Sequence, residues 1–142
     1  MIKEQIQSII NKKYPLTTNL SNVSAILNQL ENINWCGFYI VKDDGLYLGP
    51  FQGEVACSYI PFNKGICGRC YQEKQTVIIK DVLKEKDHIA CSSLSRSEIV
   101  VPIFKEKEVV ALIDIDAPIF DRFDEKDAIL LEEVAHVLED LF

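Results

Sequence analysis

The chain has 142 residues, of which 48% are hydrophobic and 26% are charged, and its formal net charge is −7. This size suits one domain, which we expect to span residues 1–142. The acidic balance disfavours nucleic acid or an anionic membrane as a partner, because phosphate binding needs clustered lysines and arginines. No apolar run approaches the roughly 18 residues of a membrane-spanning helix, and residues 1–15 lack the apolar segment of a signal peptide. We therefore expect a cytoplasmic protein.

The cysteines are the first chemical signal in the sequence. A permanent disulfide framework is disfavoured in the reducing cytosol, so the cysteines indicate metal binding, redox chemistry or simple packing. The five are Cys36, Cys57, Cys67, Cys70 and Cys91.

Residues 1–33 predict two helices. The first carries isoleucines at helical spacing and stops before Pro15, and the second runs from about Leu20 to Ile33. The apolar stripe of the second helix consists of Leu20, Val23, Ile26, Leu27 and Leu30.

Residues 34–142 predict a sheet with connecting loops. WCGFYIV and LYLG form a hairpin across residues 43–45, and a short strand follows around residues 55–60. NKGICGRC indicates a loop that leads into a short helix, and TVIIKDV is a strand. Residues 84–97 are polar and are typical of a loop that closes over a substrate.

The remaining segments complete an α+β fold. EIVVPIF and EVVALIDID are two strands joined by residues 105–107, and Asp124 is the expected N-cap of a closing helix. Strands linked by hairpins imply a central antiparallel sheet with helices packed on it. The expected buried stripe of the closing helix is Leu130, Val134, Val137, Leu138 and Leu141.

The segment LIDIDAP places two carboxylates on one side of a strand. Side chains alternate along a strand, so Asp114 and Asp116 share a face, about 7 Å apart. Two like charges this close repel unless a cation lies between them or one is protonated. The pair indicates a pocket for a cationic group or a general acid, or else a strand end that emerges into solvent near Pro118.

The segment NWCGFY contains the only tryptophan, Trp35. On an alternating strand Trp35 and Tyr39 share a face. They form either the wall of a pocket or part of an ordinary core.

Two patterns involve the pair in CGRC, Cys67 and Cys70. A CxxC pair at a helix start is typical of thioredoxin-type redox motifs, but those follow a central strand in a βαβ unit, which this antiparallel plan lacks. With His88 and Cys91 the same pair has a spacing that zinc sites use. A domain of this size does not need a structural metal, because it can bury an adequate core.

Taken together and in this order, the segments NWCGFY, LGPFQGEVAC, NKGICG, HIAC, SEIVVPI and LIDIDAP resemble the free methionine-R-sulfoxide reductase family, which is built on a GAF domain. The resemblance covers the chain from about Trp35 to the C-terminus. It implies a GAF-like domain, with the helices in residues 1–33 and the sheet, catalytic loops and last helix in residues 34–142.

The resemblance also implies roles for individual residues. The three redox cysteines of the family fall on Cys57, Cys67 and Cys91. Cys91 is then the nucleophile and Cys57 the favoured resolving cysteine, with Cys67 assisting or serving as an alternative. The substrate-contacting carboxylates fall on Glu98, Asp114 and Asp116, and the pocket aromatics on Trp35 and Tyr39. No cofactor and no metal are implied.

The expected reaction follows thiol chemistry. A thiolate attacks the sulfoxide, an acid protonates the departing oxygen, and the resulting sulfenic acid condenses with a second thiol. Thioredoxin is the implied reductant, free methionine sulfoxide the substrate, and a homodimer the expected assembly. A GAF sensor that binds a small ligand without turnover, and a domain with zinc on Cys67, Cys70, His88 and Cys91, remain the alternatives.

Overall fold

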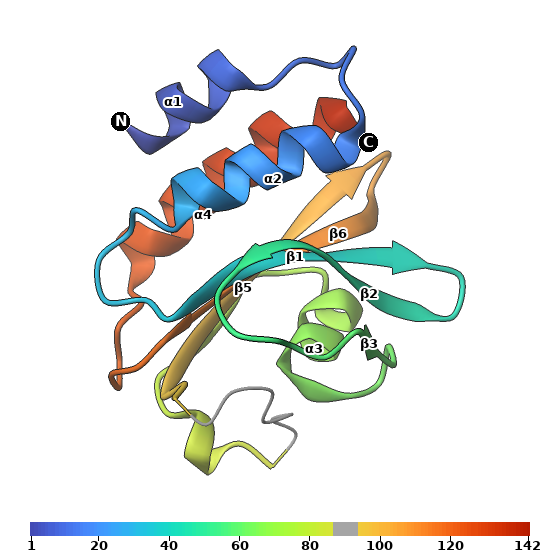
Figure 1. Cartoon of the computed structure of the whole chain (residues 1–142). Coiled ribbons are helices and arrows are strands. Elements are labelled where there is room, and N and C mark those ends of the chain that lie inside the picture. The colour runs from blue at the N-terminus through green and yellow to red at the C-terminus, as the bar shows by residue number, and fades with distance from the viewer. Residues whose placement is uncertain (87–93) are drawn as a thin grey trace.

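The computed structural model of the chain describes residues 1–86 and 94–142. Its centre is a six-stranded antiparallel sheet in the order β3-β2-β1-β6-β5-β4 (Figure 1). The predicted α+β class with a central antiparallel sheet is therefore confirmed. The strands are β1 (Trp35–Lys42), β2 (Gly45–Gln52), β3 (Tyr59–Ile60), β4 (Val77–Ile79), β5 (Ser97–Lys105) and β6 (Glu108–Ala117).

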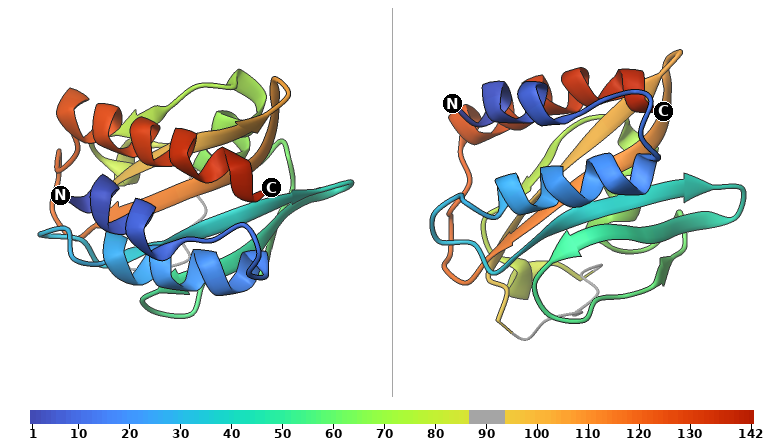
Figure 2. Two further views of the ribbon diagram at one scale, coloured as in Figure 1. Left: turned by 90° about the horizontal axis from the view of Figure 1, so that it is seen from above. Right: turned by 45° about the horizontal axis from the view of Figure 1, so that its top comes forward.

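Helices cover both faces of this sheet. On one face α2 lies along β1 and β2, α4 lies along β5, and α1 rests on α2 and α4 (Figure 2). On the other face α3 packs against β5 and β6. The helices are α1 (Ile2–Ile9), α2 (Leu16–Leu27), α3 (Gly65–Glu73) and α4 (Glu125–Leu138), with short 3₁₀ turns η1 (Val82–Lys84) and η2 (Glu139–Leu141).

The bounds of α2 differ from the sequence prediction. The helix begins directly after Pro15, whose fixed φ suits a helix start, so the predicted start at Leu20 was four residues late. The helix ends before Asn28, and Asn32 has a positive φ of 56°. Leu30 and Ile33 keep helical spacing and still pack against the core from this turn, which is why the pattern overran the helix.

The closing helix has the predicted N-cap but a shifted stripe. Asp124 accepts a hydrogen bond from the Asp127 N–H at 3.0 Å, and the Asp127 side chain accepts one from the Asp124 N–H at 2.9 Å. Of the predicted stripe only Val134 and Leu138 are fully buried. The register rotates toward small residues because α4 lies close to β5, and the buried set is Ala128, Leu131, Val134, Ala135 and Leu138.

Two further segments test the sequence reading. The strand predicted around residues 55–60 is confined to Tyr59–Ile60, and Val55 is 87% exposed. Half of the expected lid at residues 84–97 lies outside the described residues, which stop at Lys86 and resume at Leu94. No helix in the described ranges is long and apolar enough to cross a membrane.

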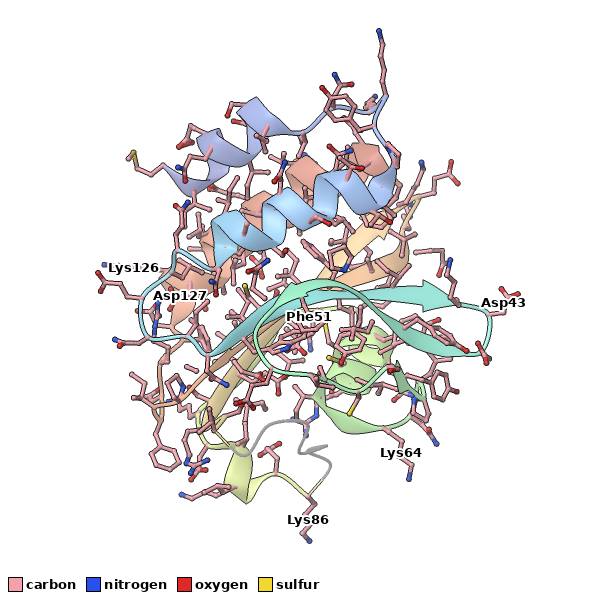
Figure 3. The ribbon with its side chains drawn as sticks, viewed as in Figure 1. Asp43, Phe51, Lys64, Lys86, Lys126 and Asp127 are labelled. Atoms are coloured by element: carbon pink, nitrogen blue, oxygen red, sulfur yellow. The ribbon has the colours of Figure 1, made fainter. Side chains whose placement is uncertain are left out.

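Alternation along the strands produces two separate cores. Phe38, Val101 and Ile113 point toward α1, α2 and α4 and belong to a large apolar cluster. Tyr39 and Val100 point to the other face, toward α3. We call the side of the sheet covered by α1, α2 and α4 the helix face, and the side covered by α3 the α3 face. Charged side chains project from the periphery of the molecule (Figure 3).

Candidate active site

Three carboxyl groups lie together on the α3 face. In the antiparallel register Asp116 of β6 is opposite Glu98 of β5, and Asp114 is opposite Val100. Side chains at opposed positions lie about 5 Å apart, and diagonal neighbours are within reach of long side chains. Glu98 is 5% exposed and Asp114 is 6% exposed, while Asp116 is partly buried. Strand alternation paired the two aspartates, the family resemblance added Glu98, and the strand register places all three on one face.

Two members of this carboxylate cluster (Glu98, Asp114 and Asp116) have raised pKa values. Burial, followed by the charges of Asp114 and Asp116, raises the pKa of Glu98 well above its usual value. Burial and the charge of Asp114 likewise raise the pKa of Asp116, against a hydrogen bond from Ser95 that lowers it. Like charges in a low-dielectric site disfavour joint ionisation. The cluster therefore needs either a shared proton or a cation.

A short hydrogen-bond chain orients Asp116. The Ser95 hydroxyl donates to Asp116 Oδ2 at 3.0 Å, and the Asn34 amide donates to Ser95 Oγ at 3.2 Å. Ser95 is 2% exposed, so this chain is shielded from water. Neither Ser95 nor Asn34 was a candidate from the sequence, because the chain joins segments that are 61 residues apart.

Aromatic rings line the site beside the carboxylate cluster. Trp35, opposite Asp116 in the β1–β6 register, stacks on Phe51 with ring centroids 5.3 Å apart. The ring centroids of Tyr39 and Trp35 lie 6.2 Å apart on the same face, as strand alternation predicted. Gly37 makes this stack possible, because a Cβ there would lie 2.4 Å from the Cβ of Phe51. Phe51 was missed in the sequence, where only its strand was identified.

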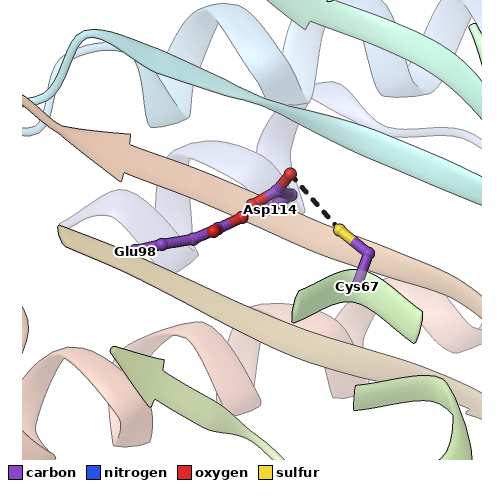
Figure 4. Close-up of side chains that lie close together, drawn as sticks. All are labelled: Cys67, Glu98 and Asp114. Atoms are coloured by element: carbon purple, nitrogen blue, oxygen red, sulfur yellow. Dashed lines mark hydrogen bonds between the residues drawn. The ribbon is translucent and has the colours of Figure 1, made fainter. Parts of the chain in front are cut away.

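Helix α3 directs two cysteines at the sheet, and they meet different partners. Cys67 Sγ donates a hydrogen bond to Asp114 Oδ2 at 3.4 Å (Figure 4). Cys70, one turn later, contacts the Val100 carbonyl at 3.7 Å. Burial, then the charge of Asp114, raises the pKa of Cys67 well above that of a free thiol, so Cys67 rests as a thiol.

The structure places Cys57 next to the aromatic wall. The Tyr39 hydroxyl donates to the Cys57 carbonyl at 2.9 Å, and Trp35 Nε1 donates to the Glu54 carbonyl at 3.0 Å. Both aromatic residues thus hold the segment that carries Cys57. Cys57 is disulfide-bonded, whereas Cys36, Cys67 and Cys70 are free thiols. The predicted nucleophile Cys91 lies outside the described residues.

The zinc alternative is altered by this geometry. His88 and Cys91 of that set lie outside the described residues. Among the residues that the structure describes, the metal-competent group around Cys67 contains Glu98 and Asp114 rather than Cys70.

Comparison with known proteins agrees with the fold. A family model described as a GAF domain matches residues 22–141. The free methionine-R-sulfoxide reductase of Escherichia coli (strain K12) is 43% identical over 121 residues, which cover 84% of this chain and 73% of that protein.

Solved structures give the same result. The chain matches free methionine-R-sulfoxide reductase of Neisseria meningitidis, solved with its substrate, at a TM-score of 0.95 and 43% identity, covering 99% of this chain and 86% of that one. It matches fRMsr of Staphylococcus aureus in the reduced form at a TM-score of 0.94 and 47% identity, covering 99% and 93% of the two chains. The chain therefore belongs to the GAF-domain family of free methionine-R-sulfoxide reductases.

Proposed function

We propose that this protein reduces free methionine (R)-S-oxide to methionine, with Cys91 as nucleophile, Cys57 as resolving cysteine and thioredoxin as reductant. The observation that carries the proposal is the buried carboxylate cluster beside the Trp35–Phe51 stack. Carboxylates of this kind suit the ammonium of a free amino acid, and an aromatic wall suits its S-methyl group.

The chemistry proceeds in four balanced steps. The Cys91 thiolate attacks the sulfoxide sulfur, and the oxygen takes up two protons and leaves as water, which gives a sulfonium with a bond between Cys91 Sγ and the methionine sulfur. Water then attacks Cys91 Sγ and breaks that bond, so that methionine and one proton are released and Cys91 becomes a sulfenic acid. The Cys57 thiol then condenses with the sulfenic acid, which forms a disulfide and water. Thioredoxin dithiol reduces this disulfide and is itself oxidised. The disulfide-bonded state of Cys57 supports its part in this cycle.

Glu98 is the proposed proton donor for the sulfoxide oxygen. Its pKa is raised by burial and by both aspartates, which favours a protonated carboxyl group at neutral pH. Asp114 and Asp116 are then proposed to bind the substrate ammonium, with the Ser95 hydrogen bond acting to lower the pKa of Asp116 against burial and the charge of Asp114. Glu98 thus supplies the acid in this proposal, and the two aspartates hold the substrate.

Cys67 is proposed as an assisting cysteine. Its thiol is held by Asp114 and resists ionisation, which suits a reserve thiol more than a nucleophile. In Cys57→Ser we expect Cys67 to take over the disulfide at a lower rate. Intact-mass measurement and disulfide mapping of the oxidised variant check this, with Cys36→Ser as the control because Cys36 lies on the helix face.

The proposed function is tested by coupled turnover. Purified protein with thioredoxin, thioredoxin reductase and NADPH, in buffer containing a metal chelator, should oxidise NADPH on the free R-sulfoxide. The S epimer and a peptide-bound sulfoxide should give little signal, since a pocket that binds the free ammonium excludes a peptide. Cys91→Ser should abolish turnover. Binding of the R-sulfoxide with no turnover in the wild type would instead support the sensor alternative.

A further inference from the structure

The carboxylate cluster and Cys67 also have the composition of a metal site. One ligand atom from each of Cys67, Glu98 and Asp114 lies within 4.8 Å of the other two, and all three side chains are buried. They converge from three elements, α3, β5 and β6 (Figure 4). We propose that Cys67, Glu98 and Asp114 form an inhibitory zinc site within the substrate pocket.

The distance between the sulfur ligand and one oxygen ligand already matches that of a tetrahedral zinc site. With Zn–S near 2.3 Å and Zn–O near 2.0 Å, the sulfur and oxygen ligands of a tetrahedral ion lie about 3.5 Å apart. Cys67 Sγ and Asp114 Oδ2 are already 3.4 Å apart. The remaining ligand, Glu98, has a longer side chain than Asp114 or Cys67. Rotation about its side-chain bonds can therefore bring its carboxylate oxygen closer to the other two ligand atoms, as a bound zinc ion requires.

Asp116 lies on the same face but does not belong to the group of ligand atoms within 4.8 Å of one another, so a water molecule would fill the fourth position of the ion. Asp116 Oδ1 is buried and has no hydrogen-bond partner among the residues described. Its other oxygen, Oδ2, is fixed by Ser95 at 3.0 Å, so the carboxylate is held in place. A thiolate with carboxylates is a ligand set that zinc accepts, whereas calcium and magnesium prefer oxygen alone.

Metal binding exchanges protons for the ion. Zinc binds a thiolate and carboxylates, so Cys67 gives up its Sγ proton and Glu98 its carboxyl proton, both to solvent, as the Zn–S and Zn–O bonds form. The double positive charge then relieves the repulsion among the buried carboxylates. The substrate ammonium is proposed to supply positive charge to the same carboxylates, so zinc and substrate compete for the same site. The inhibition rests on the proposed function, while the binding does not.

Cobalt is the probe that reports on the thiolate. The oxidised protein, in which Cys57 is in a disulfide, carries the free thiols Cys36, Cys67 and Cys70. Titrating it with cobalt chloride after chelator treatment should produce a sulfur-to-cobalt charge-transfer band and the visible bands of tetrahedral cobalt, both removed by zinc chloride. Cys67→Ser should lose the charge-transfer band, and Cys70→Ser, the matched control from the same helix, should keep it.

Asp114→Asn provides a second variant with all thiols intact. It should weaken cobalt binding by at least about tenfold, because even outer-shell partners of a metal contribute 10–100-fold. Circular dichroism checks that each variant is folded. A wild-type protein without the charge-transfer band, or a band that survives in Cys67→Ser, overturns the site. Unchanged affinity in a folded Asp114→Asn also overturns it.

Competition tests the inhibitory role separately. The double variant Cys57→Ser with Cys91→Ser leaves the same three free thiols and cannot turn over substrate. Free methionine (R)-S-oxide should raise the apparent dissociation constant of zinc for this protein in proportion to its concentration. Independence of the two ligands overturns the inhibition. Turnover in chelator without a cobalt band overturns only the zinc site, and a cobalt band without turnover overturns only the proposed function.

Discussion

The two faces of the central sheet use the same strands for different purposes. On the helix face, Phe38, Ile113 and Leu131 belong to an apolar core in which the buried polar side chains, Asn19, Ser24 and Ser97, are all uncharged. On the α3 face, Glu98 and Asp114 are buried beside a second cluster of hydrophobic residues. Because neighbouring positions on a strand point to opposite faces, one face can supply stability while the next residue along supplies chemistry.

The buried cysteines repeat this contrast. Cys36 on the helix face contacts the Ser24 carbonyl at 3.3 Å, and burial raises the pKa of its thiol to about 12. Cys67 on the α3 face contacts a carboxylate instead. Both are held as thiols, and the charge of Asp114 raises the pKa of each, but only Cys67 of the two donates a hydrogen bond directly to that carboxylate. Two cysteines thus have different chemical surroundings because they point to different faces of the sheet.

The largest expected effect is on catalysis from the α3 face. Asp114→Asn should lower kcat/KM by at least roughly 30-fold, since removing one partner of a buried charge pair costs about 2–5 kcal/mol. The coupled assay in chelator measures this, and the exposed Asp140→Asn is the control. A loss below about threefold would remove Asp114 from substrate binding.

A comparable effect on stability is expected from the helix face. Leu131→Ala in α4 should reduce the free energy of unfolding by about 2–5 kcal/mol, through lost burial and a cavity. Ile129→Ala, two residues earlier and half exposed, should change it by less than about 0.5 kcal/mol. Urea unfolding measures both, and equal effects would contradict the assignment of the buried stripe.

Glu98→Gln should lower turnover and raise the free energy of unfolding. A carboxyl group with a raised pKa favours folding at pH values below its unfolded pKa, and this contribution is lost as pH rises toward its folded pKa. The neutral amide does not titrate. The variant should therefore gain stability over the wild type as pH rises above about 4.3, by at most about 1.4 kcal/mol per pH unit, while losing turnover.

Denaturant unfolding of Glu98→Gln and wild type in chelator between acidic and neutral pH tests this sign. A stability difference that shrinks toward neutral pH would contradict it. Glu108→Gln, on an exposed residue of β6, is the control and should show no such trend.

The smallest effect is expected at the start of α4. Asp124 caps the helix, and hydrogen bonds from the Asp127 backbone lower its pKa. A lowered pKa contributes stability above the unfolded value, which is lost as pH falls through the folded value. Asp124→Ala should therefore lower the melting temperature slightly at neutral pH, and this deficit should narrow in acid. Asp124→Asn should recover part of the cap, and a deficit that widens in acid would contradict this account.

Much of the fold was readable from local pattern. The hairpin across Asp43 and Asp44, the helix at the CGRC segment and the cap at Asp124 were all predicted and are confirmed. Each depends on residues that are close in sequence, where turn and capping preferences act directly. The ends of α2 failed because apolar spacing continues past the helix in Leu30 and Ile33.

The site was only partly readable. Alternation correctly placed Asp114 with Asp116, and Trp35 with Tyr39, each on one face. It did not reach Phe51, Ser95 or the contact between Cys67 and Asp114. These depend on strand register and on how α3 lies over the sheet, and no local pattern encodes either.

The sequence by itself determined the periodicities, the caps and the motifs that mark the family, because these are properties of neighbouring residues. Only the tertiary structure decided that Cys67 hydrogen-bonds to Asp114, that Ser95 holds Asp116, and that Phe51 stacks on Trp35. The reason is that burial and electrostatic coupling arise between segments far apart in the chain. The register of β5 on β6 and the position of α3 over the sheet bring these reactive residues into one buried, electrostatically coupled cluster.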